Sequence, residues 1–132
     1  MKIAADTNVL LRAAVRDDAR QGRQAAKILQ QAELVAVAVP VLCEFVWVLR
    51  QGYKRSATEV AGALRRLVAA RNVVTNRPAV EAGIAMLDEG GDFADGAIAY
   101  EGQWLGADEF VSFDRQAVTL LKAQGQRARL VT

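Results

Sequence analysis

The stretch that decides the fold is the opening one, residues 1–14, MKIAADTNVLLRAA. A short apolar segment, KIAA, runs directly into Asp6, Thr7 and Asn8, after which apolar residues resume at helical spacing. This order predicts a buried strand, a polar turn and a helix. Asp6 at the turn can cap the helix, or it can be the first ligand of a metal site.

The same alternation of short apolar strands and helices continues along the chain. The run LVAVAV has the small and β-branched residues of a strand covered on both faces, and Pro40 suits the first turn of the helix after it. Strands are expected at 2–5, 34–39, 72–75, 109–113 and 128–132, and helices at 8–18, 19–33, 40–53, 59–71, 77–91, 93–106 and 114–125. The pattern predicts an α/β fold, a three-layer α/β/α sandwich with a central parallel sheet, as a single domain over 1–132.

The amino-acid composition limits the kinds of catalytic site that the protein can have. Among 132 residues there is no histidine and one cysteine, Cys43, which excludes zinc sites and Ser/His or Cys/His nucleophilic catalysis. The net charge of +2 permits a polyanionic partner without requiring one. The apolar stretches are too short to span a membrane, no secretory signal is visible, and a lone thiol suits a reducing compartment, so we expect a cytoplasmic protein.

Four acids occupy positions where ligands bind in such a fold. Right-handed crossovers place the carboxyl ends of all parallel strands at one edge of the molecule. Asp6 and Asp114 directly follow expected strands, and Glu44 and Asp95 lie in the first turns of expected helices. Carboxylates gathered there would repel one another, and a hard divalent cation with oxygen ligands, Mg²⁺ or Mn²⁺, would stabilise them.

Each acid also has a purely structural explanation. Asp6, or Thr7 beside it, can cap the first helix, and Asp114 can cap the last one. Asp92 and Asp95 have the spacing of a helix start, where acids favour the helix dipole.

Glu44 lies in a largely apolar helix, and its alternative is a buried ion pair with an arginine. Near the acids, Thr7, Asn8 and Ser112 offer hydroxyl and amide groups. These groups can orient a carboxylate or a water, or they can be ordinary turn and strand-end residues.

Four segments together resemble a known family. The segments DTNVLLR, VLCEFVWVL, DFADGAIAY and FVSFDR resemble, in order and spacing, the motifs of PIN-domain ribonucleases. Within that superfamily the chain most resembles the VapC toxins of bacterial toxin–antitoxin pairs. The resemblance implies a small α/β/α sandwich that cleaves RNA with Mg²⁺ or Mn²⁺ by attack of a metal-activated water.

The resemblance also assigns roles to residues. It makes Asp6 and Asp95 the principal metal ligands, has Glu44 and Asp114 complete the cluster, and leaves Asp92 as an auxiliary acid. It further implies a homodimer that a cognate antitoxin neutralises.

Three arginines are candidate contacts for RNA or antitoxin. Arg12 and Arg16 stand four residues apart on the first expected helix, and Arg115 follows Asp114; all three can equally be solvated surface residues. One residue departs from the family pattern: Gly96 stands where alanine is more common, and we expect it to loosen the start of its helix.

Two other classes of function remain open. A phosphoacceptor domain of the receiver type also places aspartates and Mg²⁺ at a sheet edge, but it needs a paired acid after the first strand and a late lysine, where this chain has Thr7 and Arg115. The other alternative is a non-catalytic binding module whose acids only cap helices.

Overall fold

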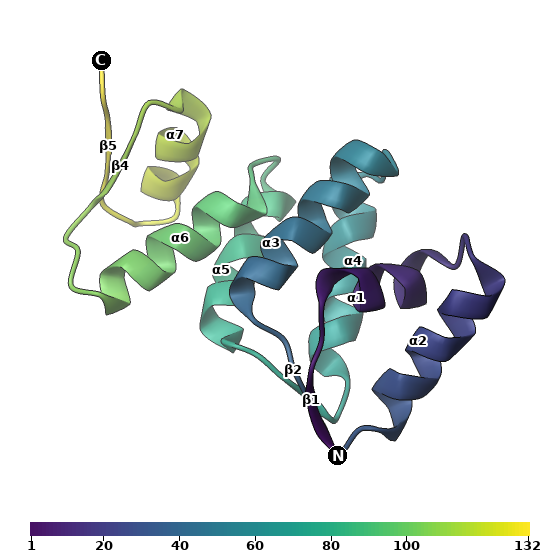
Figure 1. Cartoon of the computed structure of the whole chain (residues 1–132). Helices are drawn as coiled ribbons and strands as arrows, with labels where there is room; N and C mark the ends of the chain where they lie inside the picture. Colours follow the sequence, from purple (N-terminus) through teal and green to yellow (C-terminus); the bar gives the residue numbers. More distant parts are fainter. The chain divides into compact units, whose positions relative to one another are not determined.

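The computed structural model describes all residues, 1–132, and its elements follow the expected order (Figure 1). The strands are β1 (Lys2–Ala4), β2 (Leu34–Ala36), β3 (Val73–Val74), β4 (Phe110–Ser112) and β5 (Ala128–Leu130). The helices are α1 (Thr7–Val15), α2 (Ala19–Gln31), α3 (Val39–Trp47), η1 (Val48–Gly52), α4 (Ala57–Ala69), α5 (Arg77–Asp88), α6 (Phe93–Trp104) and α7 (Arg115–Ala123). None of these helices is long and apolar enough to cross a membrane.

The chain divides into two compact units, which we call the N-terminal unit (Met1–Asn76) and the C-terminal unit (Arg77–Thr132). Hydrogen bonding divides the strands in the same way, into a sheet with the order β1-β2-β3 and a sheet of β4 and β5. Every strand pair is parallel, as the sequence predicts.

In the N-terminal unit β2 is the central strand. Its Val35 is fully buried and lies between Ile3 of β1 and Val73 of β3 in the register. The strand ends earlier than expected, at Ala36, although the Val37 amide still donates to the Val74 carbonyl. The sheet places the ends of β1 and β2 next to each other, and α1 and α3 begin there.

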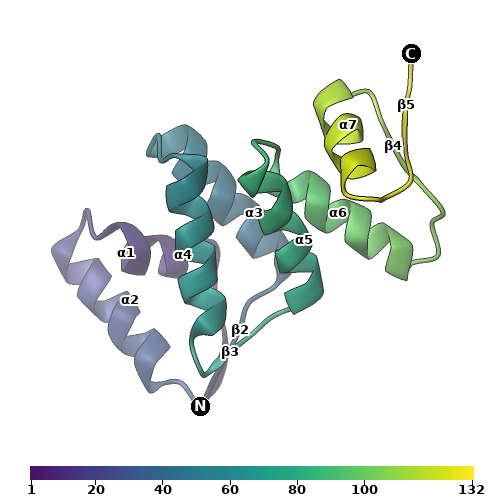
Figure 2. The same ribbon diagram turned by 180° about the vertical axis from the view of Figure 1, so that it is seen from behind.

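The helix expected at 40–53 changes character partway. It is α-helical to Trp47 and continues as the π-helix η1, which closes with the Tyr53 amide donating to the Val48 carbonyl at 3.1 Å. The next helix, α4, begins with the capping box of Ser56 and Glu59 that the sequence indicates. Figure 2 shows α4 from behind, with α1 and α2 of the same unit.

The C-terminal unit is built on the close packing of α5 against α6 and on a β4–α7–β5 crossover. Close approach requires small residues: a side chain at Gly83 would strike the Phe93 ring, and one at Gly96 would strike the Ala82 carbonyl oxygen. Gly96 therefore permits the close approach of the two helices, while the expectation that it loosens the start of α6 stays a prediction. Met86 and Leu121 are fully buried in the unit's core.

Candidate functional site

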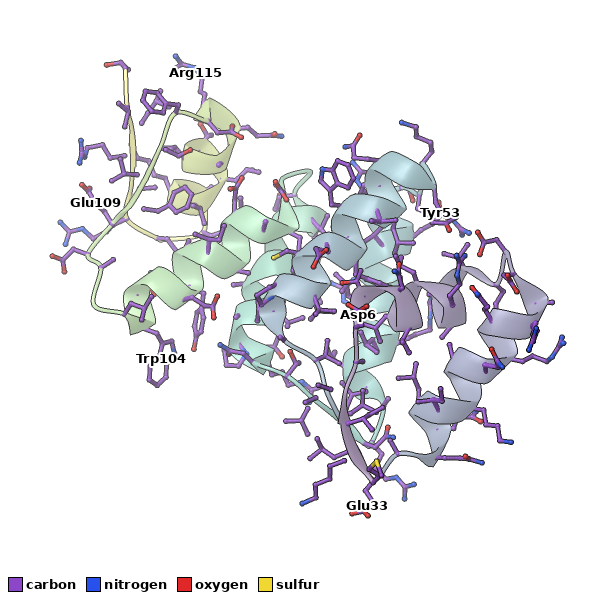
Figure 3. The ribbon with its side chains drawn as sticks, viewed as in Figure 1. Asp6, Glu33, Tyr53, Trp104, Glu109 and Arg115 are labelled. Carbon is purple, nitrogen blue, oxygen red and sulfur yellow. The ribbon has the colours of Figure 1, made fainter.

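In the N-terminal unit one buried residue, Thr7, contacts two of the candidate acids. Asp6 is the N-cap of α1, and its Oδ1 accepts a hydrogen bond from the Thr7 amide at 2.8 Å. Thr7 is the only polar side chain in the buried core, and its Oγ1 donates to Oε1 of Glu44 at 3.4 Å. Figure 3 shows Asp6 at the start of α1. The strand-to-helix turn thus positions both carboxylates.

Glu44 is exposed on α3 and forms no ion pair. The alternative of a buried ion pair with an arginine is therefore wrong. The buried faces of α3 are taken by apolar residues such as Leu42 and Phe45, and Glu44 projects from the remaining face. Its carboxylate remains hydrated, which avoids the cost of burying a charge.

In the C-terminal unit three acids lie at two helix starts. Asp92 caps α6 and accepts from the Ala94 amide at 3.0 Å, while Asp95 lies in the first turn of the same helix. Asp114 caps α7 and accepts from the Ala117 amide at 3.2 Å.

Ser112, at the end of β4, accepts a hydrogen bond from the Asp114 amide at 2.9 Å and so fixes the turn that carries this acid. This hydrogen bond within the turn is the ordinary strand-end role that the sequence allowed for Ser112.

Among these three acids, Asp95 has a raised pKa. Partial burial, together with the negative charges of Asp92 and Asp114, raises the pKa of the Asp95 carboxyl to about 6. Desolvation is the larger cause, because a half-buried carboxylate loses hydration that no donor replaces. A cation bound beside Asp95 would favour the charged carboxylate and so offset the effects of burial and of the neighbouring negative charges.

The capping explanations hold for Asp6, Asp92 and Asp114, but capping occupies only part of each carboxylate. In all three the cap uses Oδ1, and Oδ2 has no hydrogen-bond partner. Asp95 accepts no hydrogen bond with either oxygen. Each acid therefore keeps at least one oxygen available to a ligand.

Some of the other acids in the chain form ion pairs. Asp17, Glu59 and Glu109 pair with arginines, and Glu33 pairs with the N-terminal ammonium group. None of the candidate acids forms such a pair; these are Asp6, Glu44, Asp92, Asp95 and Asp114. As the side chains stand, no three acidic or thiol groups lie close enough to enclose a metal ion.

The other predicted residues have varied surroundings. Asn8 and Arg115 are exposed, and Figure 3 shows Arg115 beside the start of α7. Arg12 pairs with Asp17 at 3.1 Å. Arg16 does not share a helical face with Arg12, because α1 ends at Val15 and Arg16 follows as a left-handed C-cap with φ of 61°.

A groove in the N-terminal unit was not predicted from the sequence. It has a volume of about 610 Å³ and is lined by side chains from α1, α2, α3, η1 and α4. Leu10, Phe45 and Leu67 supply apolar lining, and Arg55 and Arg66 add charge. Its lining residues are dispersed over the sequence, so only the folded unit reveals it.

In a comparison with known families, the PIN domain family matches residues 3–119. No curated protein matches the chain. The family match confirms the α/β fold class and the parallel strands expected from the sequence. PIN domains are typically metal-dependent nucleases.

Proposed function

Because the chain belongs to the PIN domain family, we propose that it is a metal-dependent endoribonuclease whose activity depends on Asp6, Glu44, Asp95 and Asp114. The observation that carries this proposal is that Asp95 is partly buried near Asp92 and Asp114, whose negative charges help to raise its pKa, and that none of these acids has a cationic partner. The family match runs across the boundary at Asn76, which supports treating both units as one PIN domain. It also removes the reason for a receiver-like alternative.

The donor chemistry fits a divalent cation. The candidate ligands are carboxylate oxygens, Mg²⁺ prefers such hard ligands, and Mn²⁺ accepts them. Partial burial, and then repulsion from Asp92 and Asp114, raises the pKa of Asp95, and a bound cation would favour the charged form of this carboxyl. When bound, the ion would neutralise charge on the scissile phosphodiester and activate a water.

The protein's own residues hold the carboxylates in place. The Thr7 amide and hydroxyl orient Asp6 and Glu44, respectively. In the C-terminal unit the α7 cap orients Asp114, and Asp92 is an auxiliary acid that adds negative charge beside Asp95.

RNA cleavage by charge-neutral variants tests the proposal. Asp6→Asn retains an N-cap residue, and Asp95→Asn removes a charge at nearly constant volume, so both should remain folded. We expect each to cut RNA about a hundredfold more slowly than the parent in Mg²⁺. Asp108→Asn, at an exposed acid outside the candidate set, is the matched control and should cut at the parent rate.

Equal cleavage by all these proteins would refute the site assignment. Absence of cleavage in the parent with Mg²⁺ and with Mn²⁺ would instead favour a non-catalytic binding module. Circular dichroism of each variant separates loss of catalysis from loss of folding.

We further propose that the protein is the toxin of a VapBC-type pair, inhibited by a cognate antitoxin. The resemblance to VapC toxins supports this role, and the groove of the N-terminal unit offers an apolar site for a partner segment. Co-expression with the product of an adjacent small reading frame should suppress RNA cleavage. Unchanged cleavage would argue against the toxin role while leaving the nuclease assignment intact.

The proposal includes a homodimer and a cytoplasmic location. Exposed apolar side chains such as Trp104 and Leu105, at the end of α6, are the kind of surface that self-association would cover. Figure 3 shows Trp104 at this end of the helix. Light scattering should give twice the monomer mass. Cytoplasmic RNA is the expected substrate, and a lone Cys43 remains reduced there.

A further inference from the structure

One face of α2 is cationic along its length. Arg20, Arg23 and Lys27 follow one another at spacings of three and four residues, which places them on the same side of the helix. Gln24 and Gln31 lie on that side as well, and all five side chains are exposed. We call these five residues the α2 face.

The opposite side of α2 is the one that packs. Gly22 and Ala25 are buried, and a side chain at Gly22 would strike Arg16 and the Arg12 carbonyl of the preceding segment. Figures 1 and 2 both show α2 beside α1. The α2 face is thus exposed and does not pack against other elements of its unit.

No acid neutralises these cations. Helix α2 contains no acidic residue, and Asp18 before it is engaged as the N-cap, accepting from the Gln21 amide at 2.9 Å. None of the three cations forms an ion pair, although Arg12 nearby pairs with Asp17. The N-terminal unit has twelve Lys and Arg against six Asp and Glu, and the C-terminal unit has five against nine.

Helix stability does not account for the cations. Arg20 lies in the first turn of α2, where the helix dipole disfavours positive charge. Like charges three and four residues apart also repel each other. An anionic partner would relieve both penalties.

The side chains of the α2 face fit a nucleic-acid backbone better than a protein. The centre of a protein interface is built on apolar and aromatic side chains and is depleted of charge. The α2 face has none of these side chains; the half-exposed Ile28 stands beside it. Arginine, lysine and glutamine are the donors that usually contact phosphate and sugar oxygens.

We infer that the α2 face binds the sugar–phosphate backbone of the RNA substrate, outside the bond that is cut. This inference rests on the proposed ribonuclease function and adds a binding surface to it. Binding through phosphates is independent of base sequence, so the α2 face would strengthen RNA affinity without selecting the cleavage site.

The test compares two triple variants of the full chain for binding to a fluorescein-labelled single-stranded RNA, measured by anisotropy without divalent ions. The first, Arg20→Gln/Arg23→Gln/Lys27→Gln, is the α2 variant. Glutamine is a good helix former, so α2 should persist.

The second triple variant, Lys2→Gln/Arg71→Gln/Arg127→Gln, is the charge-matched control. It removes the same charge from exposed cations on β1, before β3 and before β5, none of which forms an ion pair.

We expect the α2 variant to bind RNA at least about tenfold more weakly than the control variant at low salt. Its plot of log affinity against log salt should be shallower than that of the parent by about 2, because three phosphate contacts are lost. Equal binding by the two triple variants would overturn the inference. So would competition by poly-L-glutamate as effective as that by unlabelled RNA, since the face would then bind acidic polypeptide.

Cleavage is scored separately from binding. A parent that cuts RNA while the α2 variant binds and cuts equally well refutes this inference and leaves the proposed function standing. A parent that binds RNA through the α2 face but never cuts it refutes the proposed function alone.

Discussion

The hydroxyl of Thr7 donates a hydrogen bond to the carboxylate of Glu44 over 3.4 Å, linking the start of α1 to α3 across 37 residues of sequence. Thr7 is buried and Glu44 is exposed, so the contact anchors a hydrated acid to the core of the N-terminal unit. The same residue gives its amide to Asp6. One buried residue thereby contacts two carboxylates, through its amide and its hydroxyl.

Replacing Thr7 by valine should therefore reduce cleavage. Valine has nearly the same shape but cannot donate to Glu44, and loss of a partner that orients a metal ligand typically costs about tenfold or more in activity. We expect a loss of about tenfold in kcat/KM for RNA, with a higher Mg²⁺ requirement. Thr119→Val, at an exposed threonine on α7, is the control. Parent activity in Thr7→Val would show that the hydroxyl has only a structural role.

Gly96→Ala should destabilise the C-terminal unit. Its new methyl group would strike the Ala82 carbonyl oxygen and the Met86 side chain, so α5 and α6 would have to separate. Overpacking of this kind costs about 1–3 kcal/mol of unfolding free energy, measurable by urea titration.

Gly102→Ala on the same helix is the matched control. Its methyl group meets only the Ala107 Cβ at 3.9 Å, so the higher helix propensity of alanine should leave stability unchanged or raise it by about 0.5–1 kcal/mol. If both alanine variants behaved alike, the close approach of α5 and α6 at Gly96 would be disproved.

Asp95 should make the metal-free protein less stable as the pH rises. Its folded pKa of about 6 lies above the ordinary value of 3.8, so the folded state holds the proton more tightly than the unfolded state. This group therefore lowers the unfolding free energy by a growing amount as the pH rises from about 4 to about 6, and the reduction is complete above that.

The Asp95→Asn substitution should remove this reduction in unfolding free energy. We expect it to raise the unfolding free energy near pH 7 by about 1 kcal/mol, a value reduced for solvent screening because Asp95 is only half-buried. Urea unfolding at about pH 4 and about pH 7 measures the effect, with Asp108→Asn as the control. A variant that tracks the parent at both pH values would contradict the raised pKa.

Local sequence rules anticipated much of this structure. The caps at Asp6, Asp92 and Asp114 depend on a side chain and its next few amides, and the capping box of α4 depends on Ser56 and Glu59 alone. Such interactions are encoded within a few residues. The order of strands and helices follows equally local hydrophobic periodicity.

Features that depend on distant contacts were not accessible from the sequence. The change from α3 to the π-helix η1 and the left-handed turn at Arg16 have no distinctive local signature. The groove requires five helical segments to be in place. The hydrogen bond from the Tyr53 hydroxyl to Asp17 at 2.9 Å likewise joins segments that sequence patterns treat separately.

The central claim is that the candidate acids bind a catalytic divalent cation. Calorimetric titration of Mn²⁺ tests it most directly, with the parent, Asp6→Asn, Asp95→Asn and Asp108→Asn proteins compared. We predict that the parent and Asp108→Asn bind Mn²⁺ with equal affinity and that Asp6→Asn and Asp95→Asn each bind at least about tenfold more weakly. Equal Mn²⁺ affinity in all four folded proteins, or no heat of binding in the parent, would contradict the claim.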